Sequence, residues 1–94
     1  MASKVNASHI LVKTEAEANE VYYDVTVGKK SFEDVAKSKS ICPSKKDGGS
    51  LGWFGRNQMV KEFEAAAFAM KKGEISRPVK SQFGWHIIRV DDTA

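Results

Sequence analysis

The sequence contains little of what several classes of protein require. Its single cysteine, Cys42, excludes an internal disulfide and a cysteine-rich zinc site. No apolar run approaches the roughly 20 residues that a membrane span needs. The N-terminal segment MASKVNASH also lacks the apolar stretch of a signal peptide. We therefore expect the protein to act in the cytoplasm.

Positive charge is modest overall and densest in one segment. The formal net charge is only +3, and Arg56, Arg77 and Arg89 lie far apart, which argues against a nucleic-acid surface. Residues 29–46, however, hold six lysines against two acidic residues, a local net charge of +4. These are Lys29, Lys30, Lys37, Lys39, Lys45 and Lys46. They predict either a solubilising surface or a basic patch that holds part of the protein weakly at an anionic membrane, at about 1 kcal/mol per lysine at most.

The length of 94 residues suits one domain, 1–94, with a single modest core. Hydrophobic periodicity and capping signals predict a strand at 4–13, a helix between Thr14 and Gly28, a short helix from Ser31, a strand at 50–54, a helix from about Met59 to Gly73, and strands at 75–80 and 85–91. The short connection between the last two strands favours an antiparallel hairpin. We expect an α+β fold around a small antiparallel sheet.

The segment 48–63, GGSLGWFGRNQMVKEF, combines large apolar side chains with four glycines. The apolar residues are Leu51, Trp53, Phe54, Met59 and Phe63. Glycine weakens a regular core element, and the i, i+4 spacing of Met59 and Phe63 points both the same way from a helix. This composition suits a pocket wall better than a simple turn. On composition alone, an ordinary corner of the core is the more common explanation.

The two histidines, His9 and His86, lie in the first and last predicted strands on faces with apolar or small neighbours. If those strands are adjacent, the rings can hydrogen-bond to each other. Burial would then favour neutral imidazoles with partners such as Ser81. Taken alone, each histidine is more simply explained as a core residue.

Two other kinds of chemistry use the same residue types. Zinc binding is disfavoured because His9, Cys42 and His86 come from separate elements and lack ligand spacing. A Cys-His hydrolase would have its thiol and base, but the chain shows no obvious oxyanion loop and is short for such an enzyme. Ser50 in GGSLG precedes a strand, whereas a nucleophile elbow places its serine between strand and helix.

Several motifs together resemble one known family in their order and spacing. They are ASHILV, the loop with Cys42, GGSLGWFGRNQM, VKEFEAAAFAMKKGEIS and PVKSQFGWHIIRV. The series resembles the parvulin family of peptidyl-prolyl cis/trans isomerases across almost the whole chain, and most closely its small free-standing members from archaea and bacteria. The resemblance implies a four-stranded antiparallel sheet surrounded by about four helices, one of them a helical turn near Cys42.

The resemblance also implies roles for individual side chains. His9 and His86 match the paired core histidines of the family, and Ser81 falls where a hydroxyl residue joins them. Cys42 matches a position that holds cysteine or aspartate. The proline-holding pocket corresponds to Leu51, Met59 and Phe63, with Phe54 and Gln58 beside it. Phe83 replaces a small polar residue of some members, so it would alter the histidine network or extend the pocket wall.

Membership of this family would make the protein a monomeric isomerase of X-Pro bonds in unfolded or flexible segments, with a noncovalent mechanism and no cofactor. The alternative is a peptide-binding or chaperone module of low activity on the same fold. Parvulins that select phosphorylated Ser/Thr-Pro carry a long arginine-rich loop after the first strand, and arginine forks grip phosphate bidentately. Here only Lys13 and Thr14 precede the acidic start of a helix, so we expect recognition that does not depend on phosphate.

Overall fold

A four-stranded antiparallel sheet runs through the molecule. In the computed structural model, which describes residues 3–94, β1 (Lys4–Val12) lies between β2 (Ser50–Gly55) and β4 (Gly84–Thr93). The short β3 (Val79–Ser81) pairs with the other side of β4 as the predicted hairpin. The order is therefore β2-β1-β4-β3, and the two strands that carry the histidines are neighbours.

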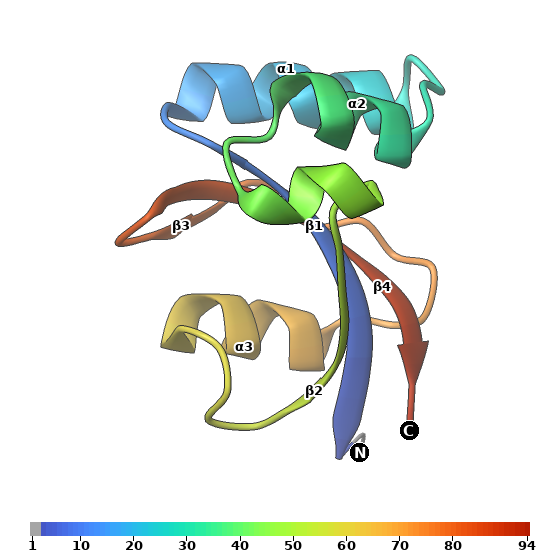
Figure 1. Cartoon of the computed structure of the whole chain (residues 1–94), viewed down its shortest axis with the longest axis vertical. Helices are drawn as coiled ribbons and strands as arrows, with labels where there is room; N and C mark the ends of the chain where they lie inside the picture. Colours follow the sequence, from blue (N-terminus) through green and yellow to red (C-terminus); the bar gives the residue numbers. More distant parts are fainter. Residues whose placement is uncertain (1–2) are drawn as a thin grey trace.

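Helices cover both faces of this sheet. α1 (Glu15–Thr26) and α2 (Phe32–Lys39) lie together on one face, and α3 (Lys61–Ala69) lies on the other (Figure 1). A short 3₁₀ helix, η1 (Pro43–Asp47), leads from α2 toward β2. The predicted α+β architecture is confirmed, with η1 as the helical turn beside Cys42.

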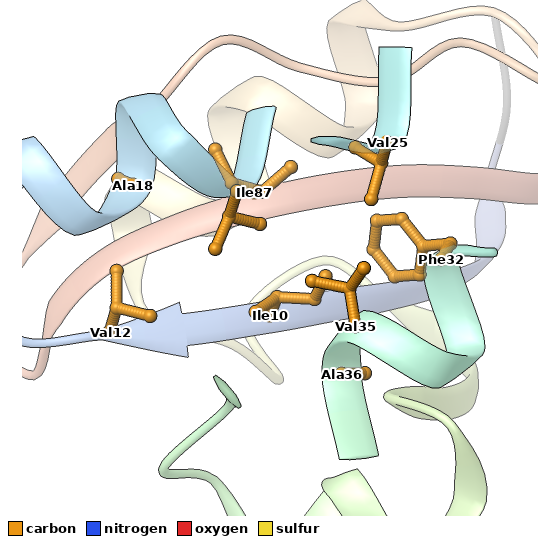
Figure 2. Close-up of a cluster of buried hydrophobic side chains, with 9 residues drawn as sticks. Ile10, Val12, Ala18, Val25, Phe32, Val35, Ala36 and Ile87 are labelled. Atoms are coloured by element: carbon orange, nitrogen blue, oxygen red, sulfur yellow. The ribbon is translucent and has the colours of Figure 1, made fainter. Parts of the chain in front are cut away.

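Alternation along β1 sends its side chains into two separate cores. Ile10 and Val12 face α1 and α2 and pack with Ile87 of β4, as Figure 2 shows. The other buried members of this cluster are Ala18, Val21, Val25, Phe32, Val35 and Ala36. Val5 and Ala7 face α3 and pack with Phe54, Phe63, Ala67, Ile88 and Val90. Because residues two apart share a face, His9 also lies on the α3 side.

The bounds of α3 and of the strand after it differ most from those expected from the sequence, and α3 ends at Ala69, short of the expected Gly73. α3 begins at Lys61, with Val60 as its N-cap, because Asn57 turns the chain with a left-handed φ of 68°. The strand expected at 75–80 is reduced to β3, while Ile75 makes only an isolated bridge with Arg89. Pro78 lies between these two pairings, and a proline has no N–H to donate to a sheet.

Candidate active site

A pocket of about 640 Å³ opens on the α3 side of the sheet. Among the residues that the sequence singled out, it is lined by His9, Cys42, Leu51, Gln58, Met59, Phe63 and His86. Phe83 also lines it and therefore extends the pocket wall. The remaining lining residues are Leu11, Ile41, Pro43 and Val60. The fold thus gathers into one cavity side chains that are up to 77 positions apart in the sequence.

The two histidines meet at this pocket as a hydrogen-bonded pair. In the register of β1 with β4, Leu11 lies opposite His86 and His9 lies opposite Ile88, so the histidines are diagonal neighbours on one face. Their Nδ1 atoms are 3.0 Å apart, and the rings stack with centroids 5.1 Å apart at an interplanar angle of 20°. A hydrogen bond between two ring nitrogens needs one N–H donor and one bare acceptor. The pair therefore requires at least one neutral imidazole.

Ser81 extends this network toward the turn between β3 and β4. Its Oγ lies 2.6 Å from His86 Nε2 and accepts the Phe83 N–H at 3.2 Å. The hydroxyl group thereby fixes the orientation of the His86 ring. At the other end, His9 Nε2 is buried and has no hydrogen-bond partner among the described residues.

Burial keeps the histidine pair uncharged. Desolvation, with a smaller contribution from charge repulsion by His86, lowers the pKa of His9 to about 4. Desolvation also lowers the pKa of His86, against the opposing attraction of the Glu62 carboxylate. At neutral pH the histidine side of the pocket is therefore polar without carrying a net charge.

Phe63 of α3 covers the histidines within the pocket. Its ring packs edge-on with both imidazoles, and each centroid distance is 5.4 Å. Phe54 packs against Phe63 at 5.8 Å and against Phe68 at 6.0 Å, and it is only 3% exposed. Phe54 was expected to belong to the proline pocket, but it does not line the pocket. Its side chain is buried in the core with α3, where it packs against Phe63.

The segment around Cys42 is held against the end of β1. Ser40 Oγ accepts two main-chain N–H groups, from Leu11 at 3.1 Å and from Cys42 at 3.3 Å. The Ile41 N–H donates to the Leu11 carbonyl at 2.8 Å. Cys42 itself is a half-buried free thiol. The Nδ1 atoms of His9 and His86 contact each other, His86 Nε2 contacts Ser81, and His9 Nε2 has no partner within residues 3–94. In this part of the chain, therefore, no hydrogen bond links the Cys42 thiol to a histidine base.

Gly49 holds the start of β2 close to the first histidine. Its carbonyl accepts the His9 N–H at 2.9 Å, and its φ is 90°, a left-handed value that suits glycine. A Cβ atom at Gly49 would lie 2.5 Å from the His9 carbonyl oxygen. Glycine at this position therefore permits a close approach of two backbones that helps to set the position of His9.

The sequence reasoning missed part of the pocket lining. Ile41 and Pro43, which flank Cys42, were not predicted as lining residues. The one signal that could have revealed Ile41 is its apolar side chain in an otherwise lysine-rich loop. Leu11 shares the strand face of His9, so alternation alone could have included it. Ile41 is 48% exposed and Phe83 is 57% exposed, which gives the lining two exposed apolar side chains.

The lysine-rich segment is partly neutralised in the folded chain. Lys39 Nζ lies 2.6 Å from a Glu20 oxygen and 3.3 Å from an Asp24 oxygen, and Lys30 Nζ lies 3.8 Å from Asp24. The other four lysines of the segment, Lys29, Lys37, Lys45 and Lys46, form no ion pair with any residue that the structure describes. Across residues 3–94, the helices are too short or too polar to cross a bilayer.

Comparisons with known proteins match this chain along most of its length. The family model for the PPIC-type PPIase domain, also called rotamase, matches residues 4–92. Foldase protein PrsA 1 of Bacillus cereus is 56% identical over 90 residues, which are 95% of this chain and 31% of that protein. The chain spans about a third of the length of the curated relatives that it matches.

Solved structures agree with this match. The peptidylprolyl isomerase PrsA of Bacillus anthracis has a TM-score of 0.95 at 44% identity, covering 99% of this chain and 43% of that one. Pin from the psychrophilic archaeon Cenarcheaum symbiosum has a TM-score of 0.81 at 52% identity, covering 96% of this chain and 93% of that one.

Proposed function

The chain belongs to the PPIC-type peptidyl-prolyl cis/trans isomerase family, the parvulins, and we propose that its pocket catalyses rotation about X-Pro bonds in unfolded or flexible polypeptides. The observation that carries the proposal is the apolar cavity lined by Leu51, Met59 and Phe63 beside a neutral histidine pair. Such a cavity suits an uncharged five-membered ring and keeps water from the amide next to it.

Rotation about an X-Pro bond requires no covalent bond to be made or broken. The amide must lose its resonance, which sets a barrier of about 18–20 kcal/mol. As resonance is lost, the carbonyl becomes less polar and the nitrogen becomes a hydrogen-bond acceptor. A dry pocket with a donor therefore stabilises the twisted amide more than the planar one. About 7 kcal/mol of such differential stabilisation would accelerate rotation roughly 10⁵-fold.

The polar residues of the pocket have separate roles in stabilising the twisted amide. Gln58 Oε1 accepts the Gly55 N–H at 2.6 Å, which leaves the Gln58 side-chain NH₂ group free to donate to the substrate. The neutral His9 and His86 orient the pocket without the strong hydration that a cationic ring would bring. Cys42 lines the pocket as a weakly polar group and needs no covalent role.

A protease-free assay tests the proposal. Exchange NMR on Ala-Pro and Leu-Pro peptides should show faster cis/trans exchange when the protein is added. Met59→Ala should remove most of the acceleration, because Met59 lines the pocket. Met70→Ala removes the same side chain from the other end of α3, outside the pocket, and should leave the rate near that of the wild type. Binding without acceleration would favour the peptide-binding module and refute catalysis.

The proposal includes recognition that is independent of phosphate. Between β1 and α1 the chain has only Lys13 and Thr14, and the first turn of α1 carries Glu15 and Glu17. A phosphate dianion at this edge would meet carboxylates and no arginine. Unphosphorylated Ser-Pro peptides should therefore be turned over at least as fast as phosphorylated ones. A large preference for phosphoserine would contradict this part of the proposal.

We also propose that the protein works in the cytoplasm as a monomer and touches anionic membrane surfaces weakly through its lysine-rich segment. The four lysines of this segment that form no ion pair in the described part of the chain support this contact. The attraction is screened beyond about 8 Å at physiological salt. Co-sedimentation should show salt-sensitive retention on anionic vesicles and none on neutral ones. Lys37→Glu with Lys45→Glu should abolish it, whereas the control Lys4→Glu with Lys71→Glu should not. Equal retention on neutral vesicles would refute the electrostatic contact.

A further inference from the structure

The loop between β2 and α3, residues 56–60, carries part of the pocket wall and lacks the usual means of holding a helix start. Gln58 and Met59 project from it into the pocket lining. Val60, the N-cap of α3, has no side-chain oxygen, and no side chain within residues 3–94 makes a cap hydrogen bond there. Asn57 takes a left-handed φ of 68°, a value that asparagine adopts more readily than most residues other than glycine. Within the loop, Gln58 Oε1 accepts the Gly55 N–H, and one further side chain holds the loop to α3.

Glu64 supplies that side chain from within the first turns of α3. One of its carboxylate oxygens accepts the Asn57 N–H, and the other lies 3.6 Å from Nη1 of Arg56. The Glu64 side chain is 16% exposed and the Arg56 side chain is 49% exposed, so only the carboxylate side of this ion pair is shielded from water. The Arg56 guanidinium in turn lies over the Phe68 ring, 4.5 Å from its centroid. The Glu64 carboxylate thus links Arg56 and Asn57, the two residues before Gln58, to α3.

We propose that Glu64 is a positioning residue for proline binding. It holds the 56–60 loop so that Met59 is already placed to contact the proline ring of the substrate. This inference rests on the proposed isomerase function. With the loop already ordered, substrate binding does not have to fix it, so affinity is gained without any contact between Glu64 and the substrate. Removing the carboxylate should weaken substrate binding more than it slows the bound amide's rotation.

Kinetics of two substitutions at Glu64 test the proposal. Glu64→Ala should lower kcat/KM about tenfold, chiefly through a higher KM, because the ordering of the loop would then occur on binding. Glu64→Gln keeps an oxygen that can accept the Asn57 N–H and should recover most of the loss. Glu17→Ala, which removes a carboxylate from the first turn of α1, is the matched control and should leave both constants unchanged. Wild-type kinetics in a folded Glu64→Ala variant would overturn the proposal.

A double-mutant comparison separates positioning from a general loss of stability. If Glu64 acts through Met59, then Glu64→Ala in a Met59→Ala background should lower kcat/KM less than twofold further. Two independent losses that multiply would overturn the proposal.

A readout without catalysis keeps this test separate from that of the isomerase function. The NMR signal of the Met59 methyl group should shift and change in relaxation in Glu64→Ala, and it should stay unchanged in Glu17→Ala. This result would hold even if no isomerase activity were found. An unperturbed Met59 methyl signal in folded Glu64→Ala would refute the positioning role itself.

Discussion

The neutral histidine pair makes stability depend on pH in a way that one substitution can isolate. His9 is 5% exposed, and burial together with His86 lowers its pKa to about 4 from the ordinary value of 6.5. In the unfolded chain the same imidazole takes up a proton near pH 6.5. Between these two pH values the unfolded state binds one more proton than the native state.

The sign and size of the effect follow from that difference. The unfolded state gains a proton that the native state resists. The contribution of neutral His9 to the free energy of unfolding is therefore complete above pH 6.5 and is lost progressively as the pH falls toward 4. At about 1.4 kcal/mol per pH unit, this one group accounts for a loss on the order of 3 kcal/mol. The pKa of His86 is lowered too, so it acts in the same direction.

Urea unfolding at several pH values between 7.5 and 4 measures this loss. His9→Asn replaces the imidazole with a polar group that does not titrate, so its free energy of unfolding should fall less steeply than that of the wild type below pH 6.5. His9→Leu is a second variant, which also lacks the titrating ring. The imidazole carbon signals of wild-type His9 should in addition stay in their neutral positions down to about pH 4. Parallel stability curves for wild type and both variants would refute the reasoning, as would an NMR pKa near 6.5.

Three further predictions concern the thiol, the loop that carries it and the closest backbone approach. Cys42→Ser and Cys42→Asp should each retain a substantial fraction of the isomerase rate, and an inactive Cys42→Asp together with a trapped thioester would contradict the noncovalent mechanism. Ser40→Ala should lower the free energy of unfolding by about 1–3 kcal/mol for each N–H group that it leaves buried without a partner, and urea unfolding with no change would show that water replaces the hydroxyl. Gly49→Ala and Gly73→Ala both place alanine at positive φ, at a strain of about 1–2 kcal/mol. Only Gly49→Ala would also press a Cβ atom against the backbone at His9, so the melting temperature of this variant should fall further than that of Gly73→Ala. Equal falls in melting temperature would contradict the close approach.

Local signals in the sequence were sufficient for most of the fold. The Thr14 hydroxyl accepts the Glu17 N–H at 3.2 Å and the Ser31 hydroxyl accepts the Asp34 N–H at 3.3 Å, so α1 and α2 begin where the capping residues predicted. The start of α3 was harder to place. Its organising contact reaches from Glu64 back to Asn57, seven residues away, and matches no ordinary capping pattern.

The sequence by itself determined the residue types of the site and the strand faces on which they lie. Alternation put His9 with the apolar face of β1, and family resemblance paired it with His86. The tertiary structure decided which apolar side chains reach the pocket. The pairing of β2 with β1 shifts register between Ala7 and Ser8, so simple alternation does not tell which side chains of β2 meet the cavity. Leu51 lines the pocket while Phe54 is buried behind Phe63, because a side chain's surroundings depend on what packs across from it, and that partner comes from a distant part of the chain.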